Sequence, residues 1–400
     1  MDKLYFDVWT CLFYTIIGIL CSMLISGFMR STDRMNPMQL KTYARRSKNR
    51  TYLLFAILLI LAVFRRVSPV LGGTDVPNYI NNFLTIQEGG IDRKANAELE
   101  PGFQLITRLI RLFTDNFKVY FMFMYGIIVY GYIRFIKDKC PKGVCYFPFI
   151  LLMYPYLKSF NTMRTSVAIA FFLLGICYLD KSKWKSLLLI TSSLLFHRVS
   201  MLFVLVWPFY MVVEKLLTKM SRWIFVVVTI VGIAVVYVIS LKLQQYAILF
   251  QVVEGTDAYY IQATLGQNYF MRYPMFFGQM ILFILLVVNY NSIKWEGQTK
   301  LLKTVFIYDL WMVPAGLVFG MWRSIEYLYL VRLSLWALII STMTKHKFKK
   351  IAVPIKIAFA IVFVFWLVFR VYKEWEDTGI SPYVFEFFTD ENTLRSIKNI

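Results

Sequence analysis

Long apolar blocks alternate with short charged connectors along almost the whole of this chain. An α-helix of roughly 20 apolar residues crosses a bilayer core about 30 Å thick, so the blocks predict membrane-spanning helices. The expected fold is an all-α, polytopic transmembrane helical bundle of about 12 spans (range 10–14), forming a single integral membrane domain over residues 1–400. The twelve predicted spans cover residues 5–28, 51–64, 119–132, 144–157, 163–179, 186–196, 201–213, 223–240, 273–289, 304–321, 327–343 and 351–369.

Composition agrees with this pattern. Apolar residues make up 58% of the chain and charged residues 17%, whereas a soluble domain has about 45–50% and about 25%. A water-soluble enzyme, a disordered tail and a fibrous repeat are therefore excluded.

The net charge of +21 is explained by the expected topology of the chain in the membrane. Nearly all the excess positive charge lies in connectors on the same side as residues 30–50, as expected for cytoplasmic loops. We therefore expect that side to be cytoplasmic, both termini to lie outside, and no nucleic acid to bind. No cysteine falls in a predicted outer loop and there are only two histidines, so we predict neither a disulfide framework nor a metal site.

Three extracytoplasmic segments follow from this topology: a large loop at 65–118, a second loop at 241–272 and a tail at 370–400. Within the first, residues 103–115 predict an amphipathic helix, because Gln104, Arg108, Arg111 and Asp115 share one face and apolar residues cover the opposite arc. Two interpretations stay open. The helix lies in the outer headgroup plane with its arginines on lipid phosphates, or Arg108 and Arg111 face a substrate.

Charged and polar residues also gather near the outer ends of the spans, where insertion into the bilayer is costly. Each arginine can reach the headgroups on its own, but a set at one depth predicts a site for a multiply charged anion such as a lipid-linked pyrophosphate. His197 is either a hydrogen-bonded packing residue, or a proton carrier or hydrogen-bond donor to a phosphate. We expect Asp309 and Lys356, which lie within spans, to pair with each other or to cap at the cytoplasmic interface. The residues of the outer set are Arg65, Arg66, Asn161, Arg164, His197, Arg272, Arg323, Glu326 and Arg332.

Four short motifs occur in order between residues 65 and 208. They are Gly73-Thr74-Asp75 followed by Tyr79, Glu100-Pro101-Gly102-Phe103, Asn161-Thr162-Met163-Arg164 and Leu195-Phe196-His197. In this order the chain resembles the EpsG-type family of bacterial exopolysaccharide polymerases, which are Wzy-like in role. It departs from the family pattern at Thr165, where Gln is usual, and at Val199, where a small or hydroxyl residue is common.

The resemblance implies a membrane glycosyltransferase that needs neither metal nor cofactor. It would polymerise undecaprenyl-pyrophosphate-linked oligosaccharide repeat units into exopolysaccharide, capsule or O-antigen. The implied location is the bacterial cytoplasmic (inner) membrane, with the active site facing outward. Membrane lipid, a chain-length regulator and a flippase are the further partners it implies.

The roles follow from the chemistry, which needs a base near the acceptor hydroxyl and cations around the departing pyrophosphate. We assign the base to Asp75 or Glu100, with His197 as the second candidate. Phosphate stabilisation is assigned to Arg164, Arg272, Arg323 and Arg332. Other substrate contacts are expected from Arg65, Arg66, Tyr79, Arg108, Arg111, Asn161 and Glu326.

Two other functions fit the same pattern. A lipid-linked oligosaccharide flippase or secondary transporter also has many spans with buried charges, although such folds usually have paired halves. An O-antigen-ligase-like glycan transferase would use the same arginines with a different acceptor.

Overall fold

The computed structural model describes residues 5–33, 35–68, 70–86, 100–217, 220–249, 273–318, 324–345 and 348–385. Within these ranges the chain is helical and forms no β-strand, and a single antiparallel bridge joins Arg65 to Phe385. The first half contains α1 (Val8–Phe28), α2 (Pro37–Val63), α3 (Val76–Thr85), α5 (Pro101–Arg111), α6 (Phe117–Lys139), η1 (Phe147–Leu152), α7 (Met153–Lys158), α8 (Met163–Tyr178), α9 (Lys183–Ser192) and η2 (Ser193–Leu195). The second half contains α10 (Ser200–Val204), α11 (Val206–Leu217), α12 (Arg222–Leu249), α14 (Tyr273–Asn289), η4 (Tyr290–Ser292), α15 (Gly297–Val318), α16 (Ser324–Tyr327), α17 (Tyr329–Lys345), η5 (Lys349–Ile351) and α18 (Ala352–Thr378).

Where the structure describes them, the twelve predicted spans fall on helices, and these helices differ in length. Five stretches in the described part of the chain are long and apolar enough to cross a membrane: Val8–Phe28, Phe117–Lys139, Arg222–Leu243, Gly297–Val318 and Lys349–Lys373. The predicted spans 144–157, 186–196 and 201–213 are each divided between two short helices. The protein is therefore an all-α membrane protein, while the number of twelve spans stays a prediction.

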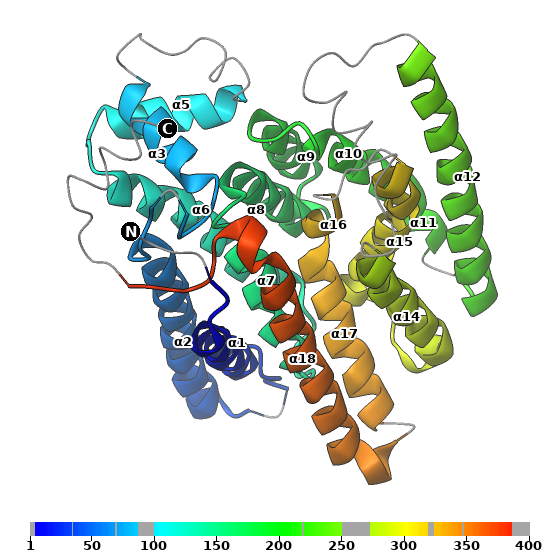
Figure 1. Ribbon diagram of the computed structural model, residues 1–400. Coiled ribbons are helices and arrows are strands. Elements are labelled where there is room, and N and C mark those ends of the chain that lie inside the picture. Colours follow the sequence, from blue (N-terminus) through cyan, green and yellow to red (C-terminus); the bar gives the residue numbers. More distant parts are fainter. Residues whose placement is uncertain are drawn as a thin grey trace.

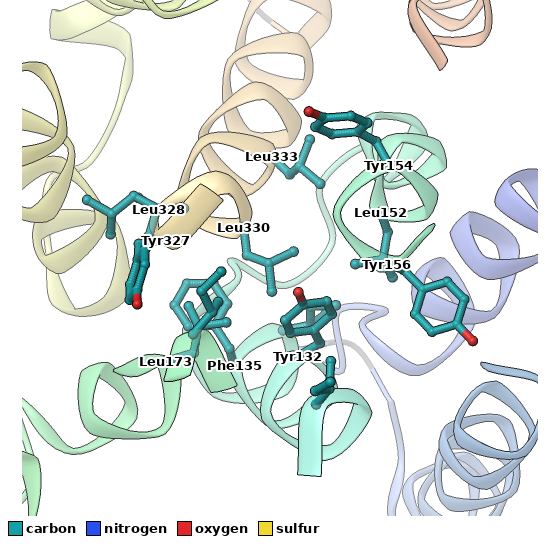
Figure 2. Close-up of a cluster of buried hydrophobic side chains, with 14 of the residues drawn as sticks. Tyr132, Phe135, Leu152, Tyr154, Tyr156, Leu173, Tyr327, Leu328, Leu330 and Leu333 are labelled. Atoms are coloured by element: carbon teal, nitrogen blue, oxygen red, sulfur yellow. The ribbon is translucent and has the colours of Figure 1, made fainter. Parts of the chain in front are cut away.

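Close packing between α6 and α8 forms the centre of the first half. A Cβ atom on Gly131 of α6 would lie 2.7 Å from the Cβ of Ala170 on α8, so only glycine lets the two backbones approach this closely. Aromatic side chains extend this core, and the rings of Phe203 and Tyr327 stack with their centroids 4.3 Å apart. Figure 2 shows where α6, α7, α8 and the start of α17 meet, with the buried side chains Tyr132, Phe135, Leu173 and Leu330 gathered at the junction.

Segments far apart in sequence meet at the ends of the bundle. The backbone N–H of Asp7 donates to Ser381 Oγ (2.8 Å), and Tyr14 Oη donates to the Ile380 carbonyl (2.7 Å). The start of α1 and the segment after α18 therefore lie together. In Figure 1, α3 and α5 lie in the upper part of the molecule, whereas the junction of α17 and α18 lies at the bottom.

Three predicted segments have different boundaries in the structure. Helix α18 continues through Arg370 to Thr378, so the predicted tail at 370–400 begins as helix. Helix α12 runs to Leu249, which takes the first residues of the predicted loop at 241–272 into a helix. In the first large loop, a helix at Pro101–Arg111 stands where 103–115 was expected, because Pro101 favours the first turn and the regular helix ends at Arg111.

Candidate functional site

The turn before α3 is clamped to the segment that starts α8. Asn161 Oδ1 accepts hydrogen bonds from Thr74 Oγ1 (2.8 Å) and from the backbone N–H of Asp75 (2.7 Å). Gly73 has φ +117°, and a Cβ there would lie 2.4 Å from the Phe160 carbonyl oxygen. Glycine is thus required both by the backbone conformation and by the close contact. This clamp holds the backbone of the half-buried Asp75 against the segment that starts α8.

An ion pair between Arg164 and Glu100 joins α8 to α5. Arg164 lies in the first turn of α8, and Glu100 is the residue immediately before Pro101 at the start of α5. The Nη1 atom of Arg164 is 2.9 Å from Glu100 Oε2, with the glutamate side chain 7% exposed and the arginine 26%. The pair is therefore sheltered from water on the glutamate side and accessible on the arginine side.

Tyr79 completes this arrangement from a third helix. Its side chain on α3 lies beside the Arg164 guanidinium, its hydroxyl donates to the Asn161 carbonyl (3.3 Å), and its ring lies 5.8 Å from that of Phe103. Three motifs that are distant in sequence thus converge on one guanidinium. We refer to Tyr79, Glu100, Asn161 and Arg164 as the Arg164 site.

The fourth motif, Leu195-Phe196-His197, packs against the start of α5. A Cβ on Gly102 would lie 2.8 Å from the Leu195 carbonyl oxygen, so the start of α5 rests on the segment that leads to His197. His197 is buried, and its Nδ1 accepts a hydrogen bond from the backbone N–H of Val199 (3.2 Å). This bond fixes the ring orientation and leaves Nε2 as the nitrogen able to face another group.

A second group of charges surrounds α7 and α16. Lys158 Nζ lies 2.6 Å from Glu326 Oε1, and the glutamate is buried. Arg370 is hydrogen-bonded to the Tyr154 hydroxyl and lies 4.4 Å from the centroid of that ring. The sequence interpretation included Glu326 but missed Lys158 and Arg370. A signal was present, since each directly follows an apolar block at the end that the predicted topology puts on the same side as Arg65.

Arg332 is held by internal partners. Its Nε is 3.3 Å from Asp309 Oδ2 on α15, and its guanidinium also bonds the Ile325 carbonyl, near the break between α16 and α17. Gln279 of α14 donates to the same Asp309 oxygen (3.1 Å). The expected pairing of Asp309 with Lys356 is wrong, because α15 turns the carboxylate toward α14 and α17 while Lys356 lies on α18. Binding of substrate by Arg332 stays a prediction.

Arg65 also forms its hydrogen bonds inside the fold. It is 2% exposed, its Nε donates to the Gly72 carbonyl (2.7 Å), and its Nη2 donates to Tyr125 Oη (3.0 Å). The backbone N–H of the half-buried Arg66 donates to the Val384 carbonyl (2.8 Å). Both arginines therefore attach the first loop to neighbouring segments.

The arginines of α5 differ from each other. Arg108 is exposed, whereas Arg111 pairs with Asp115 and lies 5.6 Å from the centroid of the Phe83 ring. The predicted phosphate-binding residues Arg272 and Arg323 lie outside the described residues. In the described ranges no group of three or more His, Cys, Asp or Glu residues is placed to hold a metal ion.

The fold and this site define an integral membrane protein in which a loop helix presents a carboxylate to an arginine at the start of a buried helix. The EpsG family model matches residues 49–385, and the chain belongs to that family, which comprises exopolysaccharide polymerases. Membership indicates polysaccharide polymerase activity in general. No curated protein and no solved structure matches the chain.

Proposed function

We propose that this protein joins undecaprenyl-pyrophosphate-linked oligosaccharide repeat units by glycosyl transfer at the outer face of the cytoplasmic membrane. The observation that supports this most directly is the Arg164 site. It brings a buried carboxylate, an arginine and a tyrosine from three motifs of the family together. Transfer from a pyrophosphate donor requires a base for the acceptor hydroxyl and a cation for the departing pyrophosphate, and the carboxylate and the arginine can supply them.

In the proposed reaction, a hydroxyl of one repeat unit attacks the anomeric carbon of the chain carried on a second lipid. The new glycosidic bond forms as the bond to the lipid pyrophosphate breaks. Glu100 takes the proton from the attacking hydroxyl, and Arg164 stabilises the charge that develops on the departing pyrophosphate. Glu100 is favoured over Asp75 as the base because its contact with Arg164 places it in the same site as the cation for the departing pyrophosphate.

Substitution of the three candidate bases distinguishes them. In a strain lacking the gene, Glu100→Gln is expected to reduce polymer synthesis by about 10²- to 10⁴-fold, the usual contribution of a general base. Asp75→Asn and His197→Gln are expected to retain most of it. The measurement is the ladder of glycan lengths, with immunoblots of the membrane fraction to establish equal amounts of protein.

The same strains separate the proposed function from its alternatives. Unpolymerised single repeats on the outer leaflet support a polymerase. Lipid-linked repeats held on the inner leaflet would instead indicate a flippase. A single block transferred to a different acceptor, without a ladder, would indicate a ligase.

A further inference from the structure

Helix α5 and the turn after it present three different faces. Phe103, Thr107 and Ile110 are buried against the protein. Four large apolar side chains point away from it, with exposed fractions of 58% for Leu105, 48% for Leu109, 67% for Leu112 and 87% for Phe113.

The polar residues lie between these two faces. At about 100° per residue, Gln104, Arg108 and Arg111 fall roughly 80–140° from Phe103, whereas the exposed apolar residues fall roughly 180–280° from it. The apolar arc of the predicted amphipathic helix is therefore divided, with one part facing the protein and one part facing away.

A helix with this pattern has three environments around it. A soluble helix at a protein surface has two, a protein face and a water face, and exposes few large apolar residues. The third face of α5 carries four large apolar side chains, as expected for a surface in contact with the hydrocarbon of lipid acyl chains. The adjoining Arg108, which is exposed, matches lipid phosphates at the edge of that hydrocarbon.

We propose that α5 lies along the membrane interface, with Leu105, Leu109, Leu112 and Phe113 among the acyl chains of the lipid leaflet and Arg108 at the phosphate level. The occupant of the exposed apolar face is therefore bilayer lipid. This inference needs only that the protein is embedded in a membrane.

Its consequence for the site rests on the proposed function. Glu100 directly precedes α5 and contacts Arg164, so a helix held in the interface also holds the carboxylate at the depth of the headgroups. The pyrophosphate of a lipid-linked substrate lies at that same depth. The lipid face of α5 would thus set the position of Glu100 along the membrane normal.

Spin labels on single introduced cysteines test the placement. The full-length protein, in vesicles of phosphatidylethanolamine and phosphatidylglycerol, is labelled after Leu109→Cys, Phe113→Cys or Arg108→Cys. Four of the five native cysteines are buried and Cys145 is half-buried, so unsubstituted protein measures the background. Collisions with oxygen report hydrocarbon, and collisions with a water-soluble nickel chelate report the aqueous phase.

Labels at positions 109 and 113 are expected to favour oxygen several-fold over the nickel chelate, with the reverse at position 108. Equal access of nickel to all three positions would overturn the inference, because α5 would then be a water-exposed roof. The labels could also be protected from both reagents, and lose that protection when the protein is diluted in lipid. This result would overturn the inference as well, because it would mean that a second copy of the protein covers the face. Because the readout requires no turnover, a failure of the polymerase proposal would leave these results unchanged.

Discussion

Arg332 and Asp309 form an ion pair between α17 and α15, with Nε and Oδ2 3.3 Å apart and both side chains nine-tenths or more buried. Asp309 also accepts from Gln279, and Arg332 also bonds carbonyls at the break between α16 and α17. Helices broken within a membrane need such side chains to satisfy the freed backbone groups. The pair therefore joins three apolar helices and stabilises the start of α17.

Removing one partner of this pair is expected to destabilise the fold. Asp309→Asn leaves the Arg332 charge buried without its counter-ion, which costs about 3–5 kcal/mol in buried pairs. We expect a marked fall in the midpoint of thermal unfolding in detergent. Lys356→Gln is the matched control and should have little effect, since Lys356 is not the partner of Asp309. An equal loss in both variants would contradict the pairing.

Arg164→Lys is expected to abolish most polymer synthesis while leaving the protein in the membrane. Lysine keeps the charge but lacks the planar group that serves Glu100 and a phosphate at once. Arg134→Lys is the control, because that arginine pairs with Asp138 near the end of α6 and lies outside the Arg164 site. The length distribution of the glycan is the measurement. A normal ladder from the Arg164 variant would refute the assignment.

Asn161→Ala is expected to loosen the turn before α3. It removes the acceptor of two hydrogen bonds and leaves the Asp75 N–H without its partner, at a cost of about 1–3 kcal/mol. Thr74→Val removes only one of the two bonds, so a smaller effect is expected. Hydrogen exchange followed by mass spectrometry should show faster exchange around Gly73–Asp75 in the first variant than in the second. Unchanged exchange in both would argue against the clamp.

Two glycines on α6 provide a matched test of the helix packing. A Cβ at Gly131 would lie 2.7 Å from Ala170 Cβ, whereas nothing lies within 4 Å of a Cβ at Gly126. Gly131→Ala is expected to destabilise the protein by about 1–3 kcal/mol through overpacking. Gly126→Ala should be neutral or stabilising by up to about 1 kcal/mol, because alanine favours helix. Thermal unfolding in detergent compares them, and similar midpoints would contradict the α6–α8 contact.

The helical character of this protein could be read from the sequence because it rests on local patterns. Each apolar block is continuous along the chain, and an apolar backbone in lipid must satisfy its hydrogen bonds within its own helix. The amphipathic pattern also predicted a helix at residues 103–115, and the structure has one at Pro101–Arg111. Motif order likewise identified the family, which the match over residues 49–385 confirms.

The partner of each charge depended on the tertiary structure. Arg65, Arg164 and Arg332 have similar positions at the ends of apolar blocks, yet one binds backbone carbonyls, one binds Glu100 and one binds Asp309. Helix rotation and crossing determine which groups meet, and contacts between residues far apart in sequence leave no periodic signal along the chain. The sequence by itself therefore determined a helical membrane protein with arginines near the ends of its apolar blocks. Only the packing of those helices decided that three motifs converge on Arg164.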